Sequence, residues 1–465
     1  MAELKTAKCV SENPCHMCMP IGGILPLKGV EGSMVLIHGS QGCSTYMRRT
    51  IAEHFNEPVD VASSALSEKG TVYGGGENLK QALDNIRRVY NPRLIGVLTT
   101  CLAETIGEDI ERLAAEYLAE RGLADLVVVP VSTPGYGGSQ ADGYYLALRR
   151  IVAALAVPTP RHDKINIIAA NVSPADLREI KRLLAAMDIE YTLLPDFADT
   201  LDRPYGEHYT RMAPGGTRLA DIRAMTGAAA TIEMGVTVAP AISPGQLLAD
   251  EYGVALHRLP IPIGVAATDL FLRTLREITG RKAPDDLLAE RGRLLDAMID
   301  SHKHNFAGRS AIFGEPEMVY AVTRTCLENG IWPTVVAAGG AGDAADSLFK
   351  AALAESPEPS YFLSETDFAE IRFRSAAAGV NVAIGPSDGR YLTEKEGIPL
   401  VRLGFPILDR MGGQRILSVG YTGTANLLDR ITNTLLDAKH HSYRSKLYEE
   451  FYKGRRLHMA PAQAR

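Results

Sequence analysis

Short runs of β-branched and apolar residues alternate along the whole chain with amphipathic stretches of about ten to fifteen residues. This alternation is typical of parallel sheets whose strands are joined by crossover helices. Residues 33–39, 93–100 and 124–132 are predicted to be buried strands of one such sheet. Residues 76–90 are predicted to be a crossover helix, because their apolar side chains recur at helical spacing. We therefore expect an α/β fold built from parallel sheets.

Two breaks divide this pattern into three blocks. Residues 156–164 contain two prolines and mixed charge, and a new apolar run follows them. A strand, a helix and a second strand follow one another over residues 309–339, and a last helix is predicted near residues 424–439. A length of 465 residues also suits three domains. The prediction is three Rossmann-like domains over residues 1–160, 161–305 and 306–465.

The composition excludes several functional classes. A formal net charge of -6 gives no chain-wide positive field, so nucleic acid is not an expected partner. No apolar run reaches the eighteen or so residues that a membrane-spanning helix needs, and the N-terminus lacks the apolar segment of a signal peptide. We expect a cytoplasmic protein with no membrane partner.

Cysteine is the residue type with the most uneven distribution. Five of the six cysteines fall in the first quarter of the chain, and in a reducing compartment such crowding indicates metal or redox chemistry before disulfides. The six are Cys9, Cys15, Cys18, Cys43, Cys101 and Cys326.

Three of these thiols are predicted to converge. Cys43 and Cys101 each follow a predicted strand and open a predicted helix, which places both sulfurs at the carboxyl edge of a parallel sheet. The partial positive charge of a helix N-terminus favours the thiolate, the form that binds iron. Cys18 lies in a segment in which Pro20 is expected to limit helix formation.

Three thiolates would hold half of an iron–sulfur cluster, with the remaining ligands supplied by a second chain at a subunit interface. The alternative is that Cys43 and Cys101 are small buried core residues, as free cysteines often are. Spacing alone leaves both interpretations open.

Several segments resemble the β-type subunit of nitrogenase component 1. They include NPCHMCMPIGG, HGSQGCSTYMRRTIAEHFNEP, TTCLAETIGEDI and PIGVAATDLFLRTLREITG, and the similarity extends over nearly the whole chain. The resemblance implies that Cys18, Cys43 and Cys101 are ligands of an 8Fe-7S P-cluster, with Cys43 bridging its two halves. It also implies a homologous α-type subunit, which shares the cluster in an α2β2 heterotetramer.

The same resemblance implies how such a complex works. An ATP-dependent homodimeric 4Fe-4S reductase supplies electrons, and the P-cluster relays them to an iron–sulfur metallocluster in the α-type subunit. The present chain would then be the relay subunit of an oxidoreductase and would carry no catalytic acid or base. Assembly scaffolds of the family keep a counterpart of Cys43 but lack counterparts of the other two cysteines, so a relay is favoured over a scaffold.

One position departs from the family pattern. Gly135 stands where nitrogenases carry a serine that can bind the oxidised P-cluster. The sequence around Cys18 also differs from that of nitrogenase β chains. These departures favour a nitrogenase-like reductase, with the K-type subunit of methylthio-alkane reductase as the nearest resemblance. That enzyme cleaves carbon–sulfur bonds of small thioethers for sulfur salvage. The alternative is the β subunit of a vanadium or iron-only nitrogenase that reduces dinitrogen, a reading that the short N-terminal segment supports.

The remaining candidates are weaker. Cys9 and Cys15 are expected to be spare surface thiols, although either could replace Cys18 as a ligand. Cys326 occupies an apolar position of a predicted helix and is expected in the core. His38 is either a donor to cluster sulfur or a structural residue.

Overall fold

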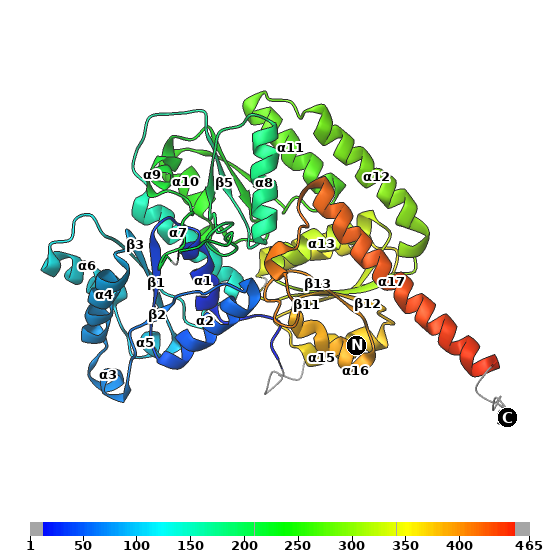
Figure 1. The fold of residues 1–465 in the computed structure, drawn as a ribbon, viewed down its shortest axis with the longest axis horizontal. Coiled ribbons are helices and arrows are strands. Elements are labelled where there is room, and N and C mark those ends of the chain that lie inside the picture. Colours follow the sequence, from blue (N-terminus) through cyan, green and yellow to red (C-terminus); the bar gives the residue numbers. More distant parts are fainter. Residues whose placement is uncertain (1–12, 209, 341, 452–465) are drawn as a thin grey trace, which may run out of the picture.

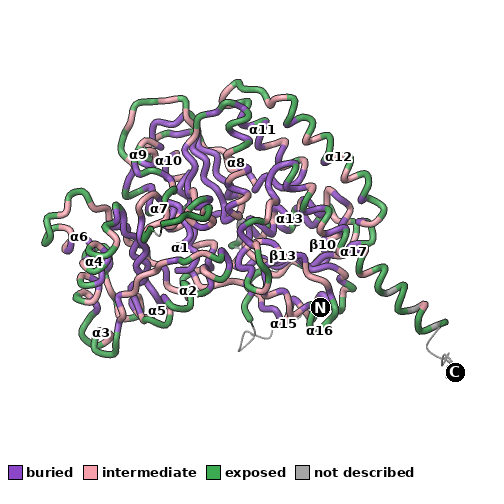
Figure 2. The backbone as a smooth tube through the Cα atoms, viewed as in Figure 1, coloured by how far each residue is buried: buried purple, intermediate pink, exposed green. Residues whose placement is uncertain are grey.

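A computed structural model of the chain describes residues 13–208, 210–340 and 342–451. Within these residues the named strands form three sheets, and every strand pair in them is parallel. Figure 1 shows the three sheets as separate layers flanked by helices, and Figure 2 shows that their strands are largely buried. The predicted α/β fold with parallel sheets is confirmed.

The first sheet is covered by helices on both faces. Helices α4 and α6 bury one face, and α1 and α7 bury the other. The strands, in sheet order, are β2 (Ala62–Ser63), β1 (Ser33–His38), β3 (Leu94–Thr99) and β4 (Val127–Val131). The helices are α1 (Met19–Lys28), α2 (Gln41–Phe55), α3 (Glu68–Tyr73), α4 (Gly76–Tyr90), α5 (Cys101–Thr105), α6 (Ile110–Arg121) and α7 (Gln140–Leu155).

The second sheet has four strands, and the chain leaves it through two consecutive long helices. The strands, in sheet order, are β6 (Tyr191–Leu194), β5 (Ile165–Ile168), β7 (Ala230–Met234) and β8 (Ala255–Leu259). The helices are α8 (Pro174–Ala186), α9 (Leu219–Ala224), α10 (Pro244–Tyr252), α11 (Val265–Thr279) and α12 (Asp285–Asn305), with short 3-10 turns at Met225–Gly227 and Pro240–Ile242.

The third sheet has five strands. In sheet order they are β11 (Tyr361–Ser364), β10 (Trp332–Ala338), β9 (Arg309–Gly314), β12 (Val382–Gly385) and β13 (Leu400–Arg402). The helices are α13 (Pro316–Glu328), α14 (Asp343–Leu353), α15 (Phe368–Ala377), α16 (Arg390–Glu396) and α17 (Gly420–Phe451), with 3-10 turns at Ser387–Gly389 and Gly413–Arg415. The strands of each sheet lie inside one of the three predicted blocks, while the domain boundaries themselves stay a prediction.

The expectation that Pro20 limits helix formation is wrong. Helix α1 begins at Met19 with Cys18 as its extended N-cap residue, and Pro20 lies in its first turn. Proline is tolerated there because the first backbone N–H groups of a helix have no partner within the helix. A proline two residues after the cysteine therefore initiates the helix.

Two other helices differ from their predicted extents. The helix predicted after Cys101 is two helices, α5 and α6, separated by a turn in which Gly107 has a φ of 78°. Helix α17 is longer than the predicted 424–439, and its last turns extend away from the body of the molecule (Figure 1). Among the described residues, no helix combines the length and apolar character that crossing a bilayer requires.

Helices α1 and α7 pack with their backbones in contact, and two glycines make this possible. A Cβ atom added at Gly22 would lie 1.8 Å from the carbonyl oxygen of Gln140, and one added at Gly143 would lie 2.0 Å from that of Met19. Two further contacts, a β-bridge between Cys18 and Ser139 and a hydrogen bond from the Gln140 N–H to the Met17 carbonyl, join the starts of the two helices. The position of Cys18 therefore depends on this contact.

We expect the Gly143→Ala variant to lose about 2 kcal/mol or more of unfolding free energy, because the added methyl group must push α1 away from α7. Gly292 is the matched control, since it is exposed in α12 and a Cβ there would meet nothing within 4 Å. Gly292→Ala is expected to raise stability by about 0.5–1 kcal/mol. Denaturant unfolding of both variants checks this, and equal stabilities would contradict it.

Candidate metal centre

The three candidate cysteines each stand at the start of a helix. Cys101 is the first residue of α5 and follows β3, and Cys43 lies in the first turn of α2, which follows β1. Because β1 and β3 are parallel neighbours, both cysteines lie at the same carboxyl edge of the first sheet. Cys18 reaches this edge as the N-cap residue of α1.

Gly135, in the loop after β4, lies between two of these thiols. Its backbone N–H donates to Cys101 Sγ over 3.1 Å. A Cβ atom added at Gly135 would lie 2.6 Å from Cys18 Sγ and 3.2 Å from Cys101 Sγ. The two sulfurs therefore flank the same glycine, and a side chain at this position would need Cys18 to move.

The thiols also influence one another electrostatically. Burial, together with smaller contributions from the nearby Cys101 and Cys43, raises the pKa of Cys18 to about 11, and a hydrogen bond from the Met19 backbone partly opposes this. The ionised form of Cys18 is thus disfavoured when nothing is bound at this edge. Bound iron would favour the Cys18 thiolate, because iron binds that form.

The three thiols lie on an open face. Cys18 and Cys43 are half-buried and Cys101 is exposed. Nearby Tyr136 is 67% exposed, so the loop after β4 is also accessible. Among the residues that the structure describes, no three His, Cys, Asp or Glu side chains are grouped tightly enough to hold a metal ion. A spread set of three thiols on an accessible face suits a multi-iron group shared with another chain better than a single ion.

Glu104, which was not predicted from the sequence, holds together the segments that carry Cys101 and Gly135. Its Oε1 accepts hydrogen bonds from the hydroxyls of Thr99 and Ser132, each over 2.5 Å. The Thr133 backbone N–H in turn donates to the Thr99 hydroxyl over 2.7 Å. These bonds join the ends of β3 and β4, and so set the position of Cys101 relative to Gly135. Only its place three residues after Cys101 could have marked Glu104 in the sequence.

His38 has a structural role. Its Nδ1 forms a hydrogen bond with Ser64 Oγ over 2.9 Å, and its Nε2 lies 3.5 Å from a carboxylate oxygen of Glu108. The ring is fully buried, and burial lowers the pKa of His38 despite the nearby carboxylate. Its ring nitrogens face these two residues and not a cysteine sulfur, which favours the structural interpretation.

The remaining cysteines lie apart from the centre. Cys15 is buried in the core of the third sheet with its Sγ 3.9 Å from the Ala337 carbonyl oxygen, so the expected surface position is wrong. Cys326 is 1% exposed, which confirms its predicted place in the core. Burial raises the pKa of each of these two thiols to about 12. Cys9 lies outside the described residues.

Comparison with known proteins identifies similar chains over almost the full length. The profile of the family described as "Nitrogenase component 1 type Oxidoreductase" matches residues 18–436. The nitrogenase molybdenum-iron protein beta chain of Clostridium pasteurianum is 35% identical over 94% of this chain and 95% of its own. The corresponding beta chain of Methanococcus maripaludis is 35% identical over 96% and 99%. Chain length therefore does not separate this protein from molybdenum-iron beta chains.

A solved structure agrees with this similarity. The chain titled "Nitrogenase Cp1 at pH 6.5" superposes with a TM-score of 0.91 at 35% identity, and the match covers 94% of this chain and 96% of that one. Similarity at this level extends to the whole arrangement of the three sheets and not to the first sheet alone.

The raised pKa of Cys18 predicts how the metal-free chain reacts with iodoacetamide. With a pKa of about 11 in place of the ordinary 9.0, roughly one Cys18 side chain in a thousand is ionised at pH 8. The alkylation rate of Cys18 should therefore rise about tenfold per pH unit from pH 8 to 10, as followed by peptide mass spectrometry. A rate that levels off by pH 9 would contradict the pKa shift.

Proposed function

Because the chain belongs to the nitrogenase component 1 type oxidoreductase family and is of its beta-chain type, we propose that it is the electron-relay subunit of a nitrogenase-like reductase. In this proposal Cys18, Cys43 and Cys101 hold half of an 8Fe-7S P-cluster. The observation that supports it best is the convergence of the three cysteines at one accessible sheet edge, with Gly135 between two of their sulfurs.

The proposal includes two partners. A homologous α-type subunit holds the other half of the cluster in an α2β2 heterotetramer and carries the active-site iron–sulfur metallocluster. An ATP-dependent homodimeric 4Fe-4S reductase is the electron donor. The exposure of Cys101 supports a shared cluster, because a ligand at the surface is accessible to groups from a second chain.

In this proposal the residues of this chain bind the cluster and hold its cysteine ligands in position. The Gly135 N–H donates to Cys101 Sγ and so stabilises negative charge on that sulfur. Burial of Cys18 limits water on the inner side, and Glu104 fixes the loop ends that carry Cys101 and Gly135. When bound, the cluster supplies one-electron transfer.

We propose further that the complex is a methylthio-alkane reductase, which cleaves the carbon–sulfur bonds of small thioethers for sulfur salvage. Gly135 supports this, because it offers no side-chain oxygen and its surroundings leave no room for a Cβ unless Cys18 moves. Without a serine oxygen at this position, the oxidised cluster would be bound differently from that of nitrogenases. This difference favours a reductase that does not reduce dinitrogen. The second candidate is a nitrogenase, molybdenum-dependent or alternative, which the 35% identity to molybdenum-iron beta chains favours.

The Cys18→Ala and Cys101→Ala variants should lose P-cluster iron. Each removes one of the three thiolates on this side, so the anaerobically purified heteromer should contain less iron and lack the P-cluster signals in EPR spectra. Cys326→Ala is the control, because Cys326 is 1% exposed in α13, on the third sheet, and is not at the edge where the three thiols converge. Unchanged iron in both test variants would refute the ligand set. Simple four-iron clusters in the wild type would indicate an assembly scaffold instead.

Growth of a deletion strain separates the two candidate substrates. If the complex is a methylthio-alkane reductase, loss of the gene should abolish growth on methylthio compounds as sole sulfur source and leave growth on sulfate intact. Complementation with the wild-type gene controls for effects on neighbouring genes. Loss of diazotrophic growth alone would reject the thioether assignment in favour of a nitrogenase.

A further inference from the structure

A cavity of about 710 Å³ lies where the three sheets meet. Its lining residues come from the segments that follow β4 in the first sheet, β5 and β7 in the second, and β9, β10 and β11 in the third. The carboxyl ends of strands from all three sheets therefore face one space, which is where open α/β sheets bind ligands. The volume is within the range of roughly 300–1,000 Å³ that is usual for small-molecule sites.

The charged side chains of the lining are acidic. Asp142, Glu315, Glu317 and Glu365 all contribute to it, and the lining residues that the structure describes include no lysine or arginine. His16 is the single basic ring among them. The carboxylates extend from Glu317, which is 6% exposed, to the exposed Glu365, so the negative charge runs from the interior to the mouth.

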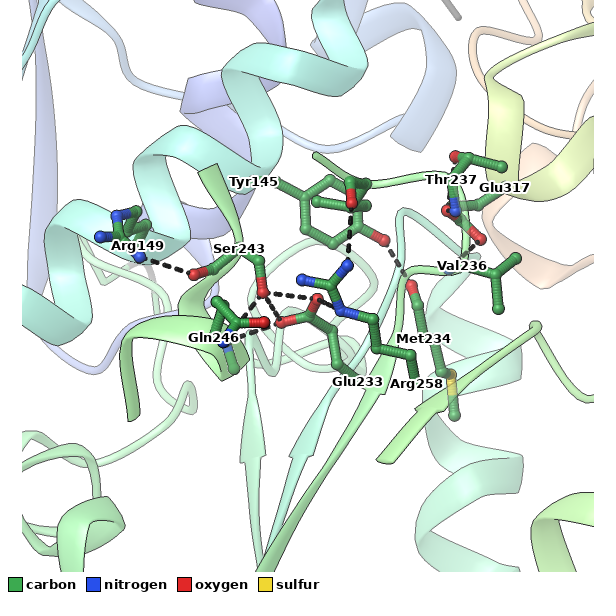
Figure 3. Close-up of polar contacts among 12 residues, drawn as sticks. Tyr145, Arg149, Glu233, Met234, Val236, Thr237, Ser243, Gln246, Arg258 and Glu317 are labelled. Carbon is green, nitrogen blue, oxygen red and sulfur yellow. Dashed lines mark hydrogen bonds and ion pairs between the residues drawn. The ribbon is translucent and has the colours of Figure 1, made fainter. Parts of the chain in front are cut away.

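The two inner carboxylates have only neutral partners. Glu317 accepts hydrogen bonds from the Thr237 N–H over 2.6 Å, the Thr237 hydroxyl over 2.5 Å and the Val236 N–H over 3.2 Å (Figure 3). Glu315 accepts from Asn171 Nδ2 over 2.9 Å and from the Gln140 amide. All the donors to Glu315 reach its Oε1, so these bonds leave Oε2 available.

The nearby arginines, Arg258 and Arg149, interact with groups other than Glu315 and Glu317. Arg258 lies 3.6 Å from Glu233, a carboxylate outside the cavity lining, and donates to the Val238 carbonyl over 3.1 Å. Arg149 donates to the Ser243 carbonyl over 2.9 Å. Figure 3 shows this second cluster beside Glu317, with neither guanidinium directed to it. Neither arginine lines the cavity.

Burial without a charged partner raises the pKa of both inner carboxyl groups. Burial raises the pKa of Glu315 to about 7, and the hydrogen bonds from Asn171 and Gln140 only partly oppose this. Burial likewise raises the pKa of Glu317 to about 7. A bound cation would favour the ionised forms of both groups.

Apolar side chains make up another part of the lining. Tyr136, which is 67% exposed, Pro240 and Ile242 present accessible apolar surface, while the rings of Tyr144 and Tyr145 are buried. The hydroxyl of Tyr144 donates to the Ala169 carbonyl over 3.1 Å, and that of Tyr145 donates to the Met234 carbonyl, so neither hydroxyl needs a partner from a ligand. Aromatic surface next to carboxylates is a common setting for organic cations.

We propose that this cavity binds a small organic cation with an apolar body, such as an amine, amidine or guanidinium compound. Its N–H groups donate to the Glu315 and Glu317 carboxylates, and its body lies against Tyr136, Pro240 and Ile242. A metal ion is a poorer fit, since the described residues contain no acidic group of three with metal-binding geometry. An anion is also a poorer fit, because the described lining has four carboxyl groups and no lysine or arginine.

Three probes of nearly equal shape test the charge preference: benzamidine as the cation, benzamide as its neutral counterpart and benzoate as the anion. Each is titrated by calorimetry into the anaerobically purified complex. We expect benzamidine to bind with a Kd at least about tenfold lower than benzamide, and benzoate to show no binding. Equal affinities for benzamidine and benzamide, binding of benzoate, or no binding of benzamidine at 10 mM would each overturn the proposal, as would displacement of benzamidine by Mn²⁺.

A pair of variants locates the site. Glu315→Gln keeps an oxygen for the Asn171 and Gln140 bonds but removes the charge, so benzamidine affinity should fall at least fivefold. Glu328→Gln is the matched control, because Glu328 lies on the same helix, α13, also accepts backbone N–H groups and does not line the cavity. Equal losses in both variants would overturn the assignment. If Glu315→Gln fails to fold, the wild-type probe series still decides.

Discussion

The contact between α1 and α7 is the constraint on which the metal centre depends. Gly22 and Gly143 let the two helix backbones touch, and this contact holds the start of α1 against the start of α7. Cys18 is the N-cap residue of α1, and the loop that contains Gly135 leads directly into α7. The distance between a sulfur at the start of one helix and a glycine before the other is therefore set by backbone packing, and a close-packed contact of this kind has little freedom to adjust.

Both sites of the molecule contain ionisable groups whose pKa is raised by burial. At the metal centre this group is Cys18, and in the cavity it is a pair of glutamates that have only neutral hydrogen-bond donors. The ionised forms of such groups are costly unless a counter-charge is bound. A bound cation at either site would therefore favour the ionised forms.

Much of the fold could be predicted from the sequence, because strand and crossover-helix periodicities are local signals. The same local signals predicted Cys43 and Cys101 at one edge of the first sheet, because each lies at the start of a helix that follows a strand. Pro20 misled the prediction, because whether proline breaks or begins a helix depends on its position relative to the cap. Glu104 was missed for a different reason: its partners, Thr99 and Ser132, come together only when β3 and β4 pair.

The cavity could not be predicted at all from local patterns. In the sequence Glu315 is only a residue before a predicted helix. Its partners come from elsewhere in the fold: Gln140 is the first residue of α7, and Asn171 lies in the loop after β5 of the second sheet. The approach of three sheets is a tertiary property that no spacing along the chain encodes. The ligand role of the cysteines, in contrast, rests on the family resemblance together with their convergence.

The segment from Gly135 to Asp142, which is the loop after β4 and the first turn of α7, belongs to both sites, and this has a consequence for genetics. Gly135 lies against the sulfurs of Cys18 and Cys101 and also lines the cavity, as do Ser139 and Asp142, which form the capping box of α7. A substitution in this segment is consequently pleiotropic, and a phenotype mapped to it does not identify which of the two sites was damaged. Suppressor mutations would have to be sought on both sides of it.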